Sequence, residues 1–386
     1  MRNESGGAAE RPRARLIPER IKEAREGRGF TLDTFAEALG VTRQAVAQYE
    51  NGQIAPSGDV LGRIISETAQ PLSFFTSVPA RAGELRAPFW RSLKRMEQHH
   101  RRRIARRLQW AADICALVER FVELPSVDFP VIAFDPDVAD EEDIERAAEA
   151  TRDHWGLGRG PIRDLAALLE RKGAIIVREP VACEAMDAVS CWIYARPFVL
   201  LSEEVISGPR DIYNLAHELG HVILHATVDL NSDNLDRIEK QANRFASAFL
   251  LPRESFSNEV LGSSLGYFET LKRRWGVSIA AMAYRCKDLD IFTDNQFSYL
   301  FKQMNWKRIR KVEPLDDAFP VNTPSVLADS MRMLVEHGVY TREQIEGSLA
   351  LNLADVESLC GVPRGYLDNR VVRLQLKREF GPESIA

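Results

Sequence analysis

The chain has 386 residues, 45% of them hydrophobic and 28% charged, and its formal net charge is −5. This composition is typical of a globular protein with room for two or three domains, and it excludes collagen-like and low-complexity chains. No apolar run approaches the roughly 18 residues that a membrane helix needs, and the N-terminus has no signal-peptide core. We therefore expect a cytoplasmic protein that does not enter a membrane. Its five scattered cysteines form no CxxC pair and are expected to be reduced.

The charge is unevenly distributed along the chain. Residues 1–120 contain 21 Lys and Arg against 14 Asp and Glu, a net +7, so the remaining residues carry −12. The excess lies in residues 77–120, with 11 basic against 4 acidic residues, whereas residues 16–76 have 6 against 8. A solvated helix face is the ordinary explanation for such a basic run, and contact with phosphate groups is the sharper one.

The N-terminal part has the pattern of a small helical domain. Residues 1–15 are polar and are expected to form a disordered lead. Four helical patterns follow in residues 16–76, with Thr31 and Thr42 as N-caps and Gly40 as a helix terminator. The turn around Gly40 has the three or four residues of a helix-turn-helix.

The middle of the chain mixes helices and strands. After a linker at 77–92, apolar residues predict a long helix over about 94–122, with a seam of Ile104, Leu108, Ala111, Cys115, Val118 and Val122. Helices are then expected at about 141–155 and after Pro161, and the sequence "GAIIVREP" predicts a strand. "DAVSCWIYARPFVLLS" predicts a β-hairpin turning around Ala195-Arg196-Pro197. A second long helix is expected over about 235–250, and the remainder is mostly helical.

The helix containing "YNLAHELGHVILH" (residues 213–225) carries ionisable side chains among apolar ones. His217 and His221 are one helical turn apart, so both imidazoles leave the same face. Two nitrogen ligands at this spacing suit Zn²⁺, and Glu218 would stand beside the ion, where it can take a proton from water. Gly220 would allow close approach at this point of the helix. A hydrogen-bonded histidine pair without a metal is the alternative.

A catalytic zinc needs a third protein ligand, and the next helix, "LDRIEKQANRFASAFLLP", offers Glu239 beside its apolar stripe. Asp236 and Asp233 are the alternatives, and a surface ion pair is the ordinary role for Glu239. His225 has rotated away from the ligand face, so it is expected behind the ligands or in plain packing. Asn243 would orient the Glu239 carboxylate or lie on the surface.

These segments carry a family resemblance. "RDIYNLAHELGHVILH" with "EKQANRFASAFLLP" resembles the ImmA/IrrE-type metallopeptidases, as do the preceding "HWGLGRGPIRDLAALLERKGAIIV" and the hairpin. "IKEAREGRGFTLDTFAEALGVTRQAVAQYENGQIAPS" resembles the helix-turn-helix of XRE-type, phage-repressor-like regulators. The resemblance covers roughly residues 16–310. Many relatives have Arg-x-Arg-Phe where this chain has Arg210-Asp211-Ile212-Tyr213.

The resemblance implies an α+β chain with five parts. These are the lead (1–15), an all-α XRE-like helix-turn-helix (16–76), a linker and long basic helix (77–130), a zincin-like peptidase domain with a small mixed sheet (131–290) and a helical accessory region (291–386). Residues 341–363 of that region faintly resemble another helix-turn-helix. The resemblance also implies zinc held by His217, His221 and Glu239, with Glu218 as the base.

Other contacts are weaker expectations. The hairpin strand with Trp192 and Tyr194 would border the cleft and let a substrate peptide add as a β-strand, although both side chains fit a core equally well. Tyr213, Tyr194 and Arg210 are candidates for stabilising the oxyanion. In the third helix of residues 16–76, the side chains expected to face the major groove of DNA are those of Thr42, Arg43, Gln44 and Gln48.

The leading hypothesis is a zinc endopeptidase fused to a DNA-binding domain. It would act as a homodimeric transcriptional or stress regulator that cleaves a repressor- or antitoxin-like protein, as members of the resembled family do. Two alternatives are a non-hydrolytic DNA-binding regulator, whose peptidase fold serves as a sensor or for dimerisation, and a metal-responsive repressor.

Overall fold

The structure is a computed structural model that describes residues 15–78, 96–180, 186–204, 207–226 and 234–367. The expected disordered lead up to residue 14, most of the expected linker and Asp233 fall outside these ranges. Within the described residues, no helix is long and apolar enough to cross a membrane.

The N-terminal domain contains the four expected helices and one more, namely α1 (Pro18–Gly27), α2 (Leu32–Leu39), α3 (Arg43–Glu50), α4 (Gly58–Thr68) and α5 (Leu72–Thr76). The side chains of Thr31 and Thr42 cap α2 and α3, as predicted, and Gly40 ends α2 with a left-handed φ of 63°. The fifth helix has only five residues and was not expected from the pattern.

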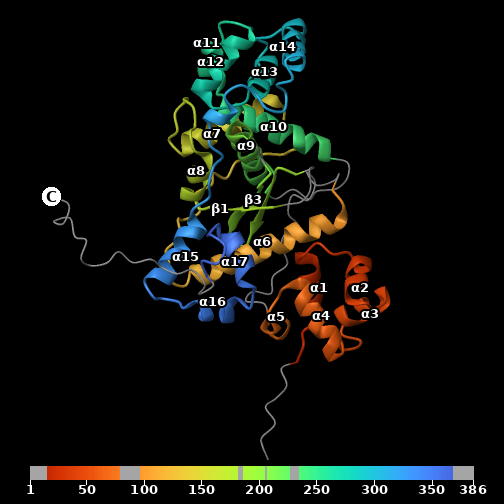
Figure 1. The fold of residues 1–386 in the computed structure, drawn as a ribbon. Helices are drawn as coiled ribbons and strands as arrows, with labels where there is room; N and C mark the ends of the chain where they lie inside the picture. The colour runs from red at the N-terminus through yellow and green to blue at the C-terminus, as the bar shows by residue number, and fades with distance from the viewer. Residues whose placement is uncertain (1–14, 79–95, 181–185, 205–206, 227–233, 368–386) are drawn as a thin grey trace, which may run out of the picture.

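The long helix α6 (Gln98–Val118) begins and ends about four residues inside the predicted range. The predicted seam is buried except for Val122, which is partly exposed. Trp110, on α6, is fully buried against α1, where a Cβ on Gly27 would lie 2.3 Å from the indole ring. Figure 1 shows α6 passing beneath the sheet, between the N-terminal domain and the C-terminal helices.

A three-stranded mixed sheet lies at the centre of the molecule, in the order β1-β3-β2. Strand β1 (Ile175–Glu179) pairs parallel with β3 (Arg196–Ser202), and β2 (Ala188–Ile193) pairs antiparallel with β3. The small mixed sheet of the expected α+β fold is therefore confirmed. The hairpin turns one position earlier than predicted, at Tyr194-Ala195 with Tyr194 at φ 57°, so Arg196 and Pro197 belong to β3.

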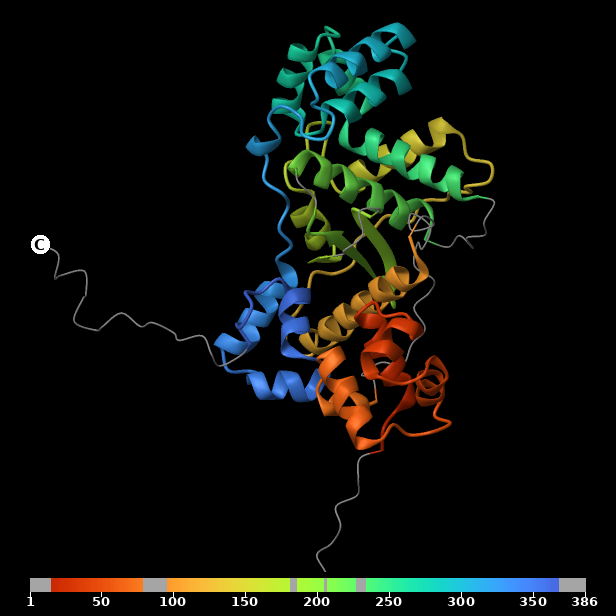
Figure 2. The same cartoon turned by 45° about the vertical axis from the view of Figure 1, so that its right-hand side comes forward.

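The two faces of the sheet belong to two hydrophobic cores. Ile175 and Val177 join a core that contains the N-terminal domain, α6 and the C-terminal helices, whereas Ile176 joins a core on the other face. That second core contains α7 (Glu141–His154), α8 (Leu165–Arg171), α9 (Gly208–Leu224) and α10 (Leu235–Leu250). It continues into α11 (Arg253–Glu259), α12 (Leu265–Trp275), α13 (Ile279–Asp288) and α14 (Asp294–Trp306), which form the far end of the molecule in Figures 1 and 2.

The chain returns from that far end along the side of the second core. Glu313 caps the start of α13 and pairs with the buried Lys272, and the short 3-10 helix η1 (Asp316–Ala318) follows. Asn322 then donates to the buried carboxylate of Asp211 near the start of α9. The segment leads into α15 (Val326–Glu336), α16 (Arg342–Leu349) and α17 (Leu353–Cys360).

The hairpin of α16 and α17 has the dimensions of the α2–α3 hairpin. Both hairpins join two eight-residue helices through three residues, 40–42 in one and 350–352 in the other. The first of those three residues is left-handed in both cases, at Gly40 and Ala350. The second helix of the C-terminal hairpin is mostly buried rather than exposed.

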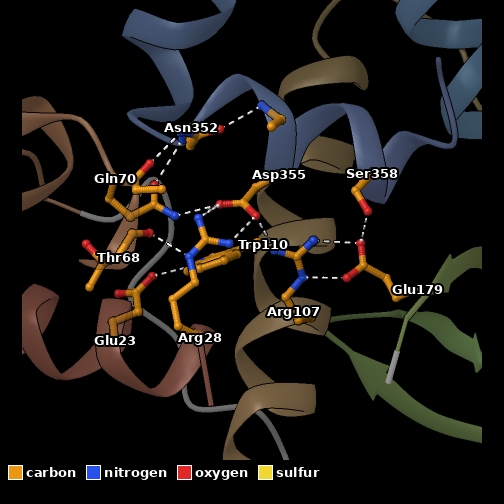
Figure 3. Close-up of polar contacts among 12 residues, drawn as sticks. Glu23, Arg28, Thr68, Gln70, Arg107, Trp110, Glu179, Asn352, Asp355 and Ser358 are labelled. Atoms are coloured by element: carbon orange, nitrogen blue, oxygen red, sulfur yellow. Dashed lines mark hydrogen bonds and ion pairs between the residues drawn. The ribbon is translucent and has the colours of Figure 1, made fainter. Parts of the chain in front are cut away.

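A cluster of ion pairs, here called the junction, joins the N-terminal domain, α6, β1 and α17 (Figure 3). Asp355 on α17 accepts two hydrogen bonds from Arg28 at 2.7 and 2.8 Å and one from Arg107 at 2.6 Å. Arg107 also donates twice to Glu179 at the end of β1, at 2.6 and 2.7 Å. Gln70 donates to Asp355 as well, at 2.7 Å.

The junction changes the interpretation of the basic run on α6. Arg106 pairs with Glu26 of α1 at 2.9 Å, Arg102 lies 3.8 Å from the same carboxylate, and Arg107 is buried. Arg107 is therefore neither on a solvated helix face nor on a free phosphate-binding surface, and Arg106 is engaged by Glu26, whereas the side chain of Arg102 remains 44% exposed. Arg106 and Arg107 join α6 to the N-terminal domain and to the C-terminal helices.

Candidate metal centre

Helix α9 presents His217 and His221 one turn apart, as the spacing predicted. The helix packs over the sheet with its apolar face, and His221 is 1% exposed. The His217 side chain retains 14% of its exposure, so the pair opens to solvent on the His217 side.

Helix α10 brings Glu239 to this pair. The two helices approach closely at Gly220, where a Cβ would lie 3.2 Å from the main chain of Ala242, so a larger residue would have to shift its neighbours. The His217 and His221 Nε2 atoms lie 3.1 Å apart, and the Glu239 carboxylate oxygens lie 3.3 Å and 3.5 Å from them. Asp236, the alternative ligand, is exposed on the first turn of α10.

The three separations can be compared with those of a zinc site. Two ligands of a tetrahedral ion, each at about 2.0–2.1 Å, are separated by about 3.3 Å. Nitrogen and carboxylate oxygen are also the donor types that zinc accepts. The residues present therefore fit a divalent ion of this kind in both spacing and chemistry.

Electrostatics ties the three side chains together. Burial lowers the pKa of His217, but hydrogen bonding to Glu239 and the charges of Glu218 and Glu239 outweigh it and leave the pKa raised. Burial raises the pKa of Glu239, but its hydrogen bonds with His217 and His221 outweigh it and hold the pKa well below its usual range. The site therefore favours a positive charge between the carboxylate and the imidazoles.

A hydrogen-bonded chain stands behind His221. Its Nδ1 lies 3.1 Å from the Nδ1 of His225, whose Nε2 lies 3.0 Å from the Gln241 side-chain oxygen. The Gln241 amide in turn donates to the carbonyl of Pro136 at 2.9 Å. Of the two expectations for His225, the position behind a ligand fits this arrangement. Sequence reasoning missed Gln241. Its burial became visible only in the structure, where it lies on the face of α10 that meets α9.

The carboxylate of Glu218 reaches Ser190 of β2. The Ser190 hydroxyl donates to its Oε2 at 2.6 Å, and the residue is 2% exposed. The edge strand β2 is thus held beside the helix that carries the candidate base. The sequence reading did not single out Ser190, because its role depends on how β2 docks against α9.

The weaker candidates fall in different places. Trp192 packs beside the C-terminal half of α9, where its indole donates to the Val222 carbonyl, and Tyr194 lies at the hairpin turn next to α6. The Tyr213 hydroxyl donates to the Asn243 carbonyl at 3.3 Å, and Arg210 donates to the carbonyl of Arg310. Tyr213 therefore lies beside α10, close to the candidate metal centre formed by His217, His221 and Glu239. Trp192 and Tyr194 do not belong to that centre.

Of the two expectations for Asn243, the surface position fits, because the residue is exposed on α10. Its amide donates to the main-chain carbonyl of Glu239 at 2.8 Å instead of to the carboxylate. Its side-chain oxygen and its main-chain carbonyl both lie within hydrogen-bond distance of the Tyr213 hydroxyl.

The expected DNA-facing residues lie on α3, on the side of the N-terminal domain away from α6 (Figures 1 and 2). Thr42, Arg43 and Gln44 are exposed, and Gln48 is partly exposed. Arg43 pairs with Asp33 of α2 at 3.1 Å. The face is therefore accessible, and a neighbouring carboxylate offsets part of its charge.

Comparison with known protein families agrees with both sites. Residues 169–287 match the family model of the IrrE N-terminal-like domain, a peptidase family, and residues 21–75 match a helix-turn-helix family model. A search of curated proteins found no match. The chain thus carries, in this order, a helix-turn-helix domain and an IrrE-type peptidase domain. This pairing supports a regulator that combines DNA binding with a metallopeptidase fold.

Proposed function

We propose that the protein is a zinc-dependent endopeptidase that regulates transcription by cleaving a repressor- or antitoxin-like protein. The observation that carries the proposal is the convergence of His217, His221 and Glu239, with separations of 3.1 to 3.5 Å between their donor atoms. A zinc ion held there would polarise the scissile carbonyl and make a water molecule more acidic.

The remaining chemistry belongs to residues of the chain. Glu218 is the group we assign to take the proton from the attacking water and to pass it to the leaving amine. Ser190 fixes one carboxylate oxygen of Glu218 and leaves the other for that proton. Gln241 and His225 hold the His221 ring in orientation through the chain that ends at Pro136.

Zinc content and cleavage test this proposal together. Purified wild type should contain about one zinc ion per chain, because the site supplies three protein ligands and leaves one position open. Co-expression with the products of neighbouring genes, followed by mass spectrometry, should reveal one cut protein. Glu218→Gln should retain zinc and lose the cut, and Asp236→Asn serves as a matched control that retains both. Full cleavage by Glu218→Gln would rule out Glu218 as the base.

A non-hydrolytic regulator is the second candidate. It is favoured by the near-complete burial of Glu218 and by the hydrogen bond that already engages one of its oxygens. In that case wild type would bind zinc and DNA but would cut none of the co-expressed proteins.

DNA binding by α3 is the second half of the proposal. Selection from a library of genomic fragments should yield one preferred sequence for wild type. Arg43→Ala should weaken binding to it by about 1–3 kcal/mol, the contribution of a good side-chain contact with a base. Lys22→Ala, an exposed change on α1, is the control and should have a smaller effect. Equal losses in the two variants would place the DNA contact elsewhere.

A further inference from the structure

A groove of about 950 Å³ lies beside the metal centre, between α7, the N-terminal half of α9, α10, α13 and α14. Its walls include Tyr213, Asn243, Lys240, Tyr284, Phe301 and Arg310. The two views of the molecule place these helices together at the upper end (Figures 1 and 2). The groove is therefore built by the peptidase domain and the helices that follow it in the chain.

The groove is connected to the candidate ligands through two of its walls. Asn243, one turn beyond Glu239 on α10, donates its amide to the main-chain carbonyl of Glu239 at 2.8 Å. Tyr213, one turn before His217 on α9, donates its hydroxyl to the Asn243 carbonyl at 3.3 Å. A peptide lying across the metal centre would thus meet the groove within a residue or two of its scissile bond.

One part of the groove is aromatic. Tyr284 packs against Phe301 with ring centroids 5.4 Å apart, and Phe297 lies 4.6 Å behind Phe301. Tyr284 remains 50% exposed. An exposed tyrosine supported by a second ring is a suitable surface for an aromatic side chain, because aromatic pairs gain about 0.5–1.5 kcal/mol beyond area burial.

In the part of the chain that the structure describes, most acidic residues that line the groove have a partner of opposite charge, whereas several of the basic ones do not. The acidic walls are largely engaged: Glu141 pairs with Arg244, Asp288 lies 3.8 Å from the same arginine, and Glu313 pairs with Lys272. Asp140 caps α7, which leaves Asp187 as the acidic wall residue without such a partner within the described chain.

The basic walls are less engaged. Among the described residues, Arg210, Lys240 and Arg310 have no carboxylate within ion-pair distance, whereas Arg237 pairs with Asp137. Arg210 donates to the main-chain carbonyl of Arg310, and the Arg310 guanidinium lies over the Phe301 ring. The uncompensated charge of the groove is therefore positive and adjoins its aromatic wall.

An unused hydrogen-bond donor adds to this picture. The side-chain amide nitrogen of Asn214, another wall residue, is buried and has no acceptor among the described residues. A carbonyl or carboxylate oxygen of a bound peptide would satisfy it, because a buried donor without a partner costs about 1–3 kcal/mol.

We propose that this groove binds the substrate segment next to the scissile bond and selects an aromatic side chain with a neighbouring carboxylate. This inference rests on the proposed peptidase function and names the kind of segment that the site accepts. Tyr284 and Phe301 would contact the ring, and Lys240, Arg210 and Arg310 would attract the acid.

Binding of labelled peptides to the full-length Glu218→Gln variant, in the presence of zinc, tests the groove without cleavage. Four fluorescein-labelled peptides would differ at two adjacent positions, Phe or Ser at one and Glu or Lys at the other. The Phe-Glu peptide should bind about tenfold more tightly than each of the other three, a difference of about 1.4 kcal/mol.

Variants assign the preference to the groove. Lys240→Gln with Arg310→Gln should abolish the preference for Glu and keep that for Phe, whereas Tyr284→Ser should weaken the preference for Phe. Lys302→Gln with Lys307→Gln removes two exposed lysines of the same region that are not groove walls, and it should change neither preference.

Three results would overturn the inference. They are the absence of binding by every peptide, equal or opposite preferences, and preferences that the groove variants leave unchanged. Failure of the proposed function would look different, because wild type would then bind the Phe-Glu peptide selectively and cut no protein. Conversely, if wild type cuts a co-expressed protein but shows no peptide preference, the proposed function would stand and the inference about the groove would be wrong.

Discussion

The candidate metal centre and the junction are both clusters of ionisable side chains between packed helices. They differ in how far their positive and negative charges offset each other. In the junction, two arginines meet two carboxylates, and their N–H groups are directed at the oxygens of Asp355 and Glu179. In the metal centre, two imidazoles and one carboxylate direct their donor atoms at a common point, 3.1 to 3.5 Å apart.

The difference separates a structural cluster from a binding site. The junction supplies its own counter-charges, so it needs nothing from outside the chain. The candidate metal centre concentrates lone pairs, and the carboxylates beside His217 raise the pKa of its imidazole, as expected for a group of donors that attracts a cation. Buried polar groups alone do not identify a site, whereas donors that lack a cation of their own do.

The largest expected effect comes from removing one donor of the metal centre. Glu239→Ala should weaken zinc binding by more than the roughly 10–100-fold lost when only an outer partner is removed, and should abolish cleavage. Metal analysis of the dialysed protein measures the first result. Asp236→Ala, on the same helix, is the control, and a normal zinc content in Glu239→Ala would remove Glu239 from the ligand set.

The junction should respond through stability instead. Asp355→Ala leaves the buried Arg107 and the partly buried Arg28 with lost partners, so unfolding should become easier by about 3–5 kcal/mol. Chemical denaturation measures this change. Asp329→Ala breaks an exposed pair with Arg332 and should cost at most about 1 kcal/mol. Equal effects of the two variants would mean that the junction contributes no more than a surface pair.

Removal of an outer partner should have a smaller effect than loss of a ligand. Gln241→Leu deprives His225 of its acceptor, so the His221 ring is less firmly oriented and zinc affinity should fall by about 10–100-fold. Competition with a coloured chelator measures this affinity. Gln303→Leu, a change on α14 outside the groove walls and the metal centre, is the control. An unchanged affinity in Gln241→Leu would limit the hydrogen-bonded chain to packing.

Lowering the pH should affect zinc affinity at the metal centre and stability at the junction differently, and this is the smallest of the expected effects. Zinc binds neutral imidazoles, and the pKa of His217 in the metal-free protein lies above 6.5, so zinc affinity should decrease steadily as the pH falls from 7 to 5. Burial raises the pKa of Asp355, but Arg107 and Arg28 outweigh it and leave the pKa below 3.8. Its contribution to stability is therefore complete above pH 3.8 and is lost as the pH falls through the lowered value.

Stability differences between wild type and Asp355→Asn, compared at pH 7 and 5, measure the junction side of this prediction. The difference should stay the same over this range while zinc dissociates. A difference that shrinks between pH 7 and 5 would contradict the lowered pKa of Asp355.

Local patterns were enough to predict much of the fold. Thr31, Thr42 and Gly40 mark helix ends through hydrogen bonds within a few residues, so their roles are visible in the sequence. The spacing of His217 and His221 is likewise local to one helix. Glu239 required only the next helix and the assumption that it packs against the first.

The parts that could not be predicted depend on long-range contacts. Asp355 meets Arg28 across 327 positions and Arg107 across 248, and no periodicity reports such pairs. Ser190 and Gln241 gain their roles from the packing of β2 and α10 against α9. The fifth helix and the ends of α6 were missed for another reason, since short helices and helix ends are decided by tertiary packing.

The close packing of Trp110 against Gly27 limits which N-terminal domains could replace the one in this protein. The indole occupies the space that any side chain at position 27 would need, and its N–H donates to Glu23 of the same helix. A helix-turn-helix domain from another protein, if joined to the rest of this chain, would therefore need a glycine at the position of Gly27 and an acceptor at the position of Glu23. Without them, Trp110 would be displaced and its indole N–H would lack an acceptor. The N-terminal domain can therefore be exchanged only together with α6, the helix that carries Trp110.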